Sequence, residues 1–185
     1  MTGLFGGAFD PPHNGHVALA ETALDHFGLE RLLALVVVDP GHRDVVLDFP
    51  TRFHLAELAF GRLPRTEIVP EEHRYTVDAV RGGRFGDAVF LVGADEFADF
   101  LSWKDPDGVL DEVRLGVATR PGFPREALEP VLERLERPDR VAFFDIPERP
   151  ISGTEIRARA SRKEPVGDLV PPEVAAEMDR LALYR

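Results

Sequence analysis

Short apolar runs alternate with stretches of helical periodicity along this chain of 185 residues. The clearest run is Leu-Leu-Ala-Leu-Val-Val-Val within residues 31–38, with Gly28 before it and Asp39-Pro40-Gly41 after it. A run of that length predicts a strand buried on both faces, as in a parallel sheet. Further strands are expected through Leu4 and Phe5 and at residues 66–69, 88–92, 114–119 and 141–146.

Helical patterns fill the spaces between these runs. After the first strand, one helix face carries Val17, Ala20, Leu24 and Phe27. Further helices are expected at 51–63, at 76–81 with Thr76 as its cap, at 97–113 with an interruption at 105–108, and at 126–135 with a kink or end at Pro130.

Two more helices are expected near the end of the chain. Ser152 is followed three residues later by Glu155, which is the spacing of a capping box at a helix start. Pro172 should begin the final helix, with Val174, Met178 and Leu181 on its apolar side.

Strands that alternate with helices predict an α/β fold with a Rossmann-like, doubly wound parallel sheet. We expect a single domain over 1–185, with a core of about 1–147 and a small C-terminal helical extension of about 148–185. Ligands of such sheets bind at the carboxyl ends of the strands, near the switch point in strand order. The distinctive loops at 6–16, 39–44, 93–95, 120–122 and 151–157 should therefore line one edge.

The first of these loops has the composition of a phosphate site. Gly6-Gly7 lets the backbone approach an anion, and the following helix start offers free N–H groups. His13 and His16 fall in the first helical turn, where they would point the same way and donate hydrogen bonds to phosphate oxygens. A plain turn with solvated histidines is the alternative interpretation.

Other strand-end loops carry further candidates, each with a structural alternative. At the helix start near 151–157, Ser152, Thr154 and Arg157 would all face an anion, or they form a simple cap with a solvated arginine. Asp95 either contacts a ligand or caps the helix that follows it. Trp103, the only tryptophan, either lines a site or belongs to the core.

Composition and charge exclude several classes of function. The chain has 33 acidic and 22 basic residues, a formal net charge of −11, which disfavours a nucleic-acid partner. It has no cysteine and therefore no disulfide, thiolate metal site or thiol nucleophile. Nothing resembles a signal peptide, and no apolar run approaches the roughly 18 residues of a membrane span. We expect a soluble cytoplasmic protein without a membrane partner.

The run from Gly6 to His16 resembles the G-G-x-F-D-P-x-H-x-G-H signature of the nucleotidyltransferase superfamily, with every specified position matched. The run from Ile151 to Arg157 resembles its second signature, I-S-[ST]-T-x-I-R, with Gly153 where a second hydroxyl residue is usual.

A narrower resemblance extends over most of the chain. Gly93-Ala94-Asp95 with Phe100 and Trp103 is similar to the G-A-D-x-x-x-x-F-x-x-W pattern of bacterial nicotinate-mononucleotide adenylyltransferases. The segments that resemble this family's S-Y-T, R-P-G and usual C-terminus are Tyr75-Thr76, Arg120-Pro121-Gly122 and Leu183-Tyr184.

This resemblance implies adenylyl transfer from ATP to nicotinate mononucleotide, with Mg²⁺ accompanying ATP and no protein residue assigned as a metal ligand. The implied catalytic residues are His13, His16 and Arg157. The implied ATP-binding residues are Gly6, Gly7, Phe9, His13, His16, Gly93, Asp95, Arg120, Ser152, Thr154 and Arg157. The implied acceptor-binding residues are Arg43, Tyr75, Thr76, Asp95 and Trp103. The resemblance implies that Asp95 contacts the adenylyl ribose or the acceptor ribose beside it, and that Asp10 either adds to the metal shell or serves the turn.

The chain departs from the family pattern on the acceptor side. The loop 39–44 is shorter than usual and lacks the customary lysine, for which Arg43 is the nearest substitute. Glu71-Glu72-His73-Arg74 precedes Tyr75 where a Gly-Pro approach is typical. Three alternatives therefore stay open: another phosphorylated acceptor, a nucleotide-binding homologue with weak or no turnover, and a purely structural protein. A homo-oligomer is also possible.

Overall fold

The computed structural model describes residues 1–41, 45–120, 124–147 and 151–185. Six parallel strands form one sheet in the order β3-β2-β1-β4-β5-β6. The strands are β1 (Thr2–Gly7), β2 (Arg31–Val37), β3 (Thr66–Glu71), β4 (Ala88–Gly93), β5 (Arg114–Thr119) and β6 (Val141–Asp145). The predicted doubly wound parallel sheet is thus confirmed, although β3 extends two residues beyond the expected 66–69.

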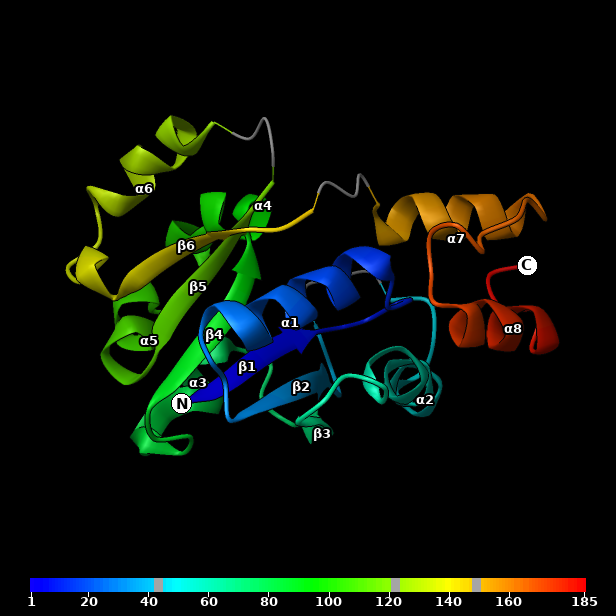
Figure 1. Ribbon diagram of the computed structural model, residues 1–185, viewed down its shortest axis with the longest axis horizontal. Helices are drawn as coiled ribbons and strands as arrows, with labels where there is room; N and C mark the ends of the chain where they lie inside the picture. Colours follow the sequence, from blue (N-terminus) through cyan, green and yellow to red (C-terminus); the bar gives the residue numbers. More distant parts are fainter. Residues whose placement is uncertain (42–44, 121–123, 148–150) are drawn as a thin grey trace.

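Helices cover both faces of the sheet (Figure 1). Successive strand residues face opposite sides, so Phe5 packs in one apolar cluster and Leu4 in the other. The Phe5 cluster includes residues of α1 (Asn14–His26), α2 (Phe49–Phe60), α7 (Gly153–Ser161) and α8 (Pro172–Arg180). The Leu4 cluster includes residues of α3 (Thr76–Val80), α4 (Ala94–Ala98), α5 (Pro106–Glu112) and α6 (Glu129–Leu132).

The switch point lies between β1 and β4, which pair although they are far apart in sequence. The chain leaves β1 toward α1 on one face and leaves β4 toward α4 on the other. A crevice opens where consecutive connections part in this way, at the carboxyl ends of the two strands. The loop that carries His13 and the first turn of α4, which carries Asp95, border this crevice.

Several helix predictions need correction. The expected 97–113 helix is three pieces: α4, the 3₁₀ turn Phe100–Ser102, and α5, whose N-cap Asp105 accepts a hydrogen bond from the Gly108 N–H. Pro130 does not end a helix but stands in the first turn of α6, where its missing N–H costs nothing.

The structure also corrects the predicted cap of α3 and the predicted apolar face of α8. Thr76 is the first residue of α3 rather than its cap, because the N-cap is Tyr75 and no side chain caps there. Helix α8 ends at Arg180, so Leu181 leaves the apolar side and is 41% exposed, whereas Val174 and Met178 are buried as predicted. Within the described residues, no helix has the length and apolar character needed to cross a membrane.

Candidate active site

A cavity of about 1000 Å³ occupies the carboxyl edge of the sheet. This volume is at the upper end of the range for ligand pockets, roughly 300–1000 Å³. The predicted site residues that line it are Gly6, Gly7, Phe9, His13, His16, Tyr75, Thr76, Gly93, Asp95, Trp103, Arg120, Ser152, Thr154 and Arg157. Arg43 is outside the described residues.

The two histidines form a reciprocal cap at the start of α1. His13 is the N-cap, and its Nδ1 accepts from the His16 N–H at 3.3 Å, while His16 Nδ1 accepts from the His13 N–H at 3.2 Å. The rings stack with centroids 3.6 Å apart and an angle of 18° between planes. Because each Nδ1 is an acceptor, a neutral ring carries its proton on Nε2, which is then a donor for a ligand.

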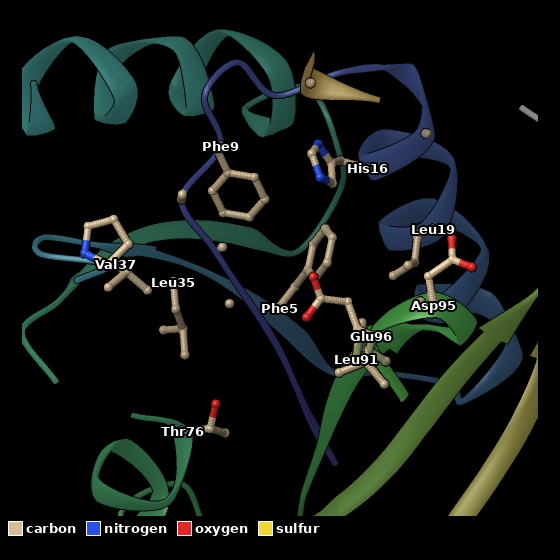
Figure 2. A pocket seen from close by; sticks show the side chains of 18 of the residues that line it. Phe5, Phe9, His16, Leu19, Leu35, Val37, Thr76, Leu91, Asp95 and Glu96 are labelled. Atoms are coloured by element: carbon tan, nitrogen blue, oxygen red, sulfur yellow. The ribbon is translucent and has the colours of Figure 1, made fainter. Parts of the chain in front are cut away.

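His13 is the more buried of the pair. Burial lowers its pKa from 6.5 to about 4, so the ring is neutral at pH 7. A neutral Nε2–H donates a hydrogen bond without adding a buried charge to the unliganded protein. Figure 2 shows His16 next to Phe9, and their rings meet edge to face at 5.3 Å.

The loop before α1 is tightly packed. Phe9 has a φ of 50°, and a Cβ at Gly7 would lie 2.9 Å from the Phe9 ring, so a side chain at position 7 would displace that ring. Asp10, joined to Pro11 by a cis peptide, is 7% exposed. Its carboxylate accepts from the Val46 N–H at 2.5 Å and from the Tyr184 hydroxyl at 2.6 Å. Each Asp10 carboxylate oxygen thus accepts a hydrogen bond that anchors the loop to another segment of the chain.

Sequence reasoning missed Arg52, a 1% exposed arginine on α2. Its guanidinium donates to four carbonyl oxygens, those of Leu47 (3.2 Å), Ala8 (2.8 Å), Val37 (2.9 Å) and Val38 (3.0 Å). Burial lowers the pKa of Arg52, and the nearby Asp10 charge opposes that effect. Arg52 therefore ties the Gly6–His16 loop to the end of β2. The sequence did carry one sign that Arg52 is buried: it falls on the same helix face as the apolar residues Leu55 and Ala59.

The start of α7 brings the second signature to the first. Ser152 is the predicted N-cap and accepts from the Glu155 N–H at 3.2 Å, whereas the Glu155 carboxylate accepts from Arg159 at 2.8 Å. Arg157 donates to the Asp10 carbonyl at 2.8 Å and to Thr154 Oγ1 at 3.3 Å. A Cβ at Gly153 would lie 3.2 Å from the Arg157 guanidinium, so the glycine leaves room for that side chain. Residues 147 positions apart thereby share one wall of the cavity.

Asp95 lies at the opposite wall and is not a helix cap. The N-cap of α4 is Gly93, and no side chain caps there. The Asp95 carboxylate is 77% exposed and contacts Arg120 at 3.5 Å. Figure 2 shows Asp95 and Glu96 on α4, on the other side of Phe5 from Phe9. The contact between Asp95 and Arg120 joins the ends of β4 and β5 at the cavity.

Trp103 and Tyr75 lie toward the β3–α3 end of the cavity. Trp103 is only partly buried, and it meets Phe100 and Phe90 edge to face at 5.2 and 6.3 Å. It is therefore both a core neighbour and a lining residue. Tyr75 is 42% exposed, with Lys104 Nζ 4.8 Å from its ring centroid.

Charged residues near this end were not assigned from the sequence. Arg74 pairs with Asp39 at 2.5 Å, which holds the pKa of Asp39 below its usual value. Buried Glu71 accepts from His73 Nδ1 at 2.7 Å and from Arg84 at 3.0 Å. Glu71, His73 and Arg74 line the cavity. Of these three, Arg74 supplies a cationic group where the loop 39–44 lacks the usual lysine.

Among the described residues, no group of three or more His, Asp or Glu side chains is arranged to hold a metal ion. Asp10, the one side chain considered for a metal shell, has both carboxylate oxygens engaged by Val46 and Tyr184. The described lining residues thus form no preformed cage for a metal ion, an arrangement that suits an ion carried in by a polyphosphate.

Comparison with known proteins agrees with this geometry. The cytidylyltransferase-like family model matches residues 4–159. A protein of Moorella thermoacetica named "Probable nicotinate-nucleotide adenylyltransferase" is 36% identical, with 99% of this chain and 91% of that protein covered. One of the same name from Thermus thermophilus is 34% identical, with 99% and 98% covered.

Solved structures show the same fold. The nicotinic acid mononucleotide adenylyltransferase of Plasmodium falciparum, solved in complex with NaAD, superposes with a TM-score of 0.80. Its sequence is 16% identical, and the match covers 99% of this chain and 96% of that one. The chain belongs to the cytidylyltransferase-like family and, within it, to the nicotinate-nucleotide adenylyltransferases.

Proposed function

We propose that this protein transfers the adenylyl group of ATP to nicotinate mononucleotide, a step of NAD biosynthesis. A 5′-phosphate oxygen of the mononucleotide forms a bond to the α-phosphorus of ATP, and the bond from that phosphorus to the bridging oxygen of the β-phosphate breaks. The products are deamido-NAD and pyrophosphate. The observation that carries the proposal is the joining of the two signature stretches in one cavity, where Arg157 contacts the Asp10 carbonyl.

The ATP side of the site comprises the residues around β1 and the start of α7. His13 and His16 donate from Nε2 to the α-phosphate and stabilise charge that develops on it during transfer. Arg157 and the first turn of α7 at Ser152 and Thr154 hold the β- and γ-phosphates. Because phosphoryl chemistry asks little covalent work of a protein, positioning and charge stabilisation supply most of the rate.

The acceptor side comprises the loops at β3 and β4. Trp103 offers an aromatic edge to the pyridine ring, and the backbone at Tyr75 and Thr76 binds its carboxylate. Asp95 binds a ribose hydroxyl. Arg43 remains a proposed contact, and we add Arg74, whose guanidinium lines the cavity, as a second cation for the acceptor phosphate.

A divalent ion bound to the triphosphate, Mg²⁺ in our proposal, neutralises part of the phosphate charge. We assign its coordination to phosphate oxygens and water. Both Asp10 oxygens already accept hydrogen bonds from Val46 and Tyr184.

A second candidate is nucleotidyl transfer to another phosphorylated acceptor. It is favoured by the departure at the acceptor loops, where His73 and Arg74 precede Tyr75. The presence of the partly buried Trp103 in the cavity lining favours the pyridine nucleotide over another acceptor. A homologue without turnover would bind ATP and release no pyrophosphate.

The test is pyrophosphate release from ATP and Mg²⁺ with nicotinate mononucleotide, its amide, or phosphopantetheine as acceptor. We compare the unchanged protein with His16→Ala and with His54→Ala, a control for an exposed histidine on α2. Release that needs a pyridine mononucleotide and is lost only in His16→Ala supports the proposal. Release only with phosphopantetheine, or ATP binding with no release at all, contradicts it.

A further inference from the structure

Tyr184 follows α8 and takes no part in the steps proposed above. Its hydroxyl nevertheless donates to Asp10 Oδ1 at 2.6 Å, across 174 positions of sequence. The side chain is partly buried, and Leu183 beside it packs against the cluster shared by α1, α2, α7 and α8. The segment after α8 turns back between α7 and α8 (Figure 1). It is therefore fixed next to the loop of the first signature.

Asp10 connects three separate segments. Its two carboxylate oxygens accept from Tyr184 and from the Val46 N–H, and its backbone carbonyl accepts from Arg157. A buried carboxylate is stable only when its oxygens have donors. If the Tyr184 hydroxyl is lost, residue 10 keeps only one of its two side-chain anchors, so its backbone and carbonyl are held less rigidly.

We propose that Tyr184 is a positioning residue of the ATP site: its hydroxyl fixes the Asp10 carboxylate and thereby the carbonyl that orients Arg157. This inference rests on the proposed role of Arg157 in holding the triphosphate. Without Tyr184, Arg157 loses a fixed partner 2.8 Å away and samples more orientations. Part of the binding free energy of ATP is then spent on ordering that side chain.

The hydroxyl of Tyr184 is a dependable donor. Burial and the Asp10 charge both raise its pKa above the usual value, so the phenol keeps its proton at neutral and moderately alkaline pH. The contact therefore does not switch with pH in the range where the enzyme would be assayed.

The main experiment compares the unchanged protein with Tyr184→Phe, which removes the hydroxyl and keeps the ring. ATP binding is measured by calorimetry, and both KM values come from initial rates. We expect ATP binding to weaken roughly tenfold and the ATP KM to rise in parallel, with the KM for nicotinate mononucleotide unchanged. Leu181→Ala, an exposed change in the same segment, should leave all three at their original values.

A double-mutant cycle locates the effect. Asp10→Asn alone should also weaken ATP binding, because an amide nitrogen cannot accept one of the two hydrogen bonds. Adding Tyr184→Phe to it should cost less than Tyr184→Phe costs alone. Additive effects, full ATP affinity in Tyr184→Phe, or a fall in stability with both substrates affected equally would each overturn the inference.

Failure of the proposed function is distinguishable from failure of this inference. If the unchanged protein binds ATP but transfers nothing to nicotinate mononucleotide, the function fails. The calorimetric comparison still decides for or against Tyr184, because it needs no acceptor.

Discussion

His13 and His16 each accept, through Nδ1, a hydrogen bond from the backbone N–H of the other, and their rings stack 3.6 Å apart. Neither ring can rotate without giving up a cap of α1. The two Nε2 donors are therefore held in place before a nucleotide binds, which is the arrangement that electrostatic stabilisation of a transition state requires.

This reciprocity makes the capping role of His16 separable from the catalytic role that we propose for its Nε2 donor. In His16→Asn, the amide oxygen can replace Nδ1 as an acceptor for the His13 N–H, but nothing replaces Nε2. We expect its unfolding free energy to stay within about 0.5 kcal/mol of the original, while kcat falls about 100-fold with little change in the ATP KM. Urea unfolding and initial-rate kinetics measure the two effects. A change confined to KM would contradict the assigned role.

His13 should make stability depend on pH. Its pKa is about 4 when folded and near 6.5 when unfolded, so between these values only the unfolded chain takes up the proton. Stability due to the neutral ring is present above pH 6.5 and is lost as pH falls toward 4, by roughly 3 kcal/mol in total. His13→Asn lacks this titration. Between pH 7.5 and 4.5, the unfolding free energy of His13→Asn should therefore rise by roughly 2–3 kcal/mol relative to that of the original protein. Urea unfolding at the two pH values measures this, and a difference that stays the same at both would contradict a lowered pKa for His13.

Trp103→Ala should weaken the binding of the acceptor nucleotide and leave the binding of ATP unchanged. The ring is partly exposed to the cavity, so its loss removes a contact with the pyridine ring and leaves the ATP side intact. We expect the KM for nicotinate mononucleotide to rise about tenfold and the KM for ATP to stay unchanged. Trp103→Phe, which keeps an aromatic ring, is the matched control. Unfolding of the alanine variant would show that the side chain serves the core instead.

Arg74 should bind the acceptor through its phosphate. We expect Arg74→Ala to weaken the binding of nicotinate mononucleotide about tenfold, because a charge-assisted hydrogen bond to the phosphate is lost. Arg74→Lys, which keeps the charge, should recover part of that affinity. Binding of nicotinate riboside, which lacks the phosphate, should be the same in all three proteins. If riboside binding weakens as much as mononucleotide binding, Arg74 only supports the loop through its contact with Asp39.

Arg52→Met should lower stability strongly. The change leaves four buried carbonyls without their donor, and we expect a loss of roughly 3–5 kcal/mol in unfolding free energy. Arg62→Met is the control, since that side chain is 77% exposed and should change stability by less than about 0.5 kcal/mol. Similar effects of the two changes would refute the assignment of Arg52 as the tie between two loops.

The sheet and the start of α7 at the cavity were predictable because their signals are local. Apolar runs predicted the strands, and the spacing of Ser152 and Glu155 predicted the start of α7. The contacts of Arg52 and Tyr184 were not predictable, since each depends on segments that meet only in the folded chain. Thr76 was mistaken for a cap because local sequence does not show which residue first adopts helical geometry. The individual roles of the lining residues stay predictions.

The contact between Arg157 and the Asp10 carbonyl has a thermodynamic consequence for the whole molecule. A nucleotide that bridges the start of α1 and the start of α7 can bind fully only when both have docked on the sheet. Its binding and the global folding equilibrium are then linked, and free ATP at 100 times its dissociation constant adds about 2.7 kcal/mol to the unfolding free energy. The melting temperature would thus report on cellular nucleotide supply as well as on the sequence.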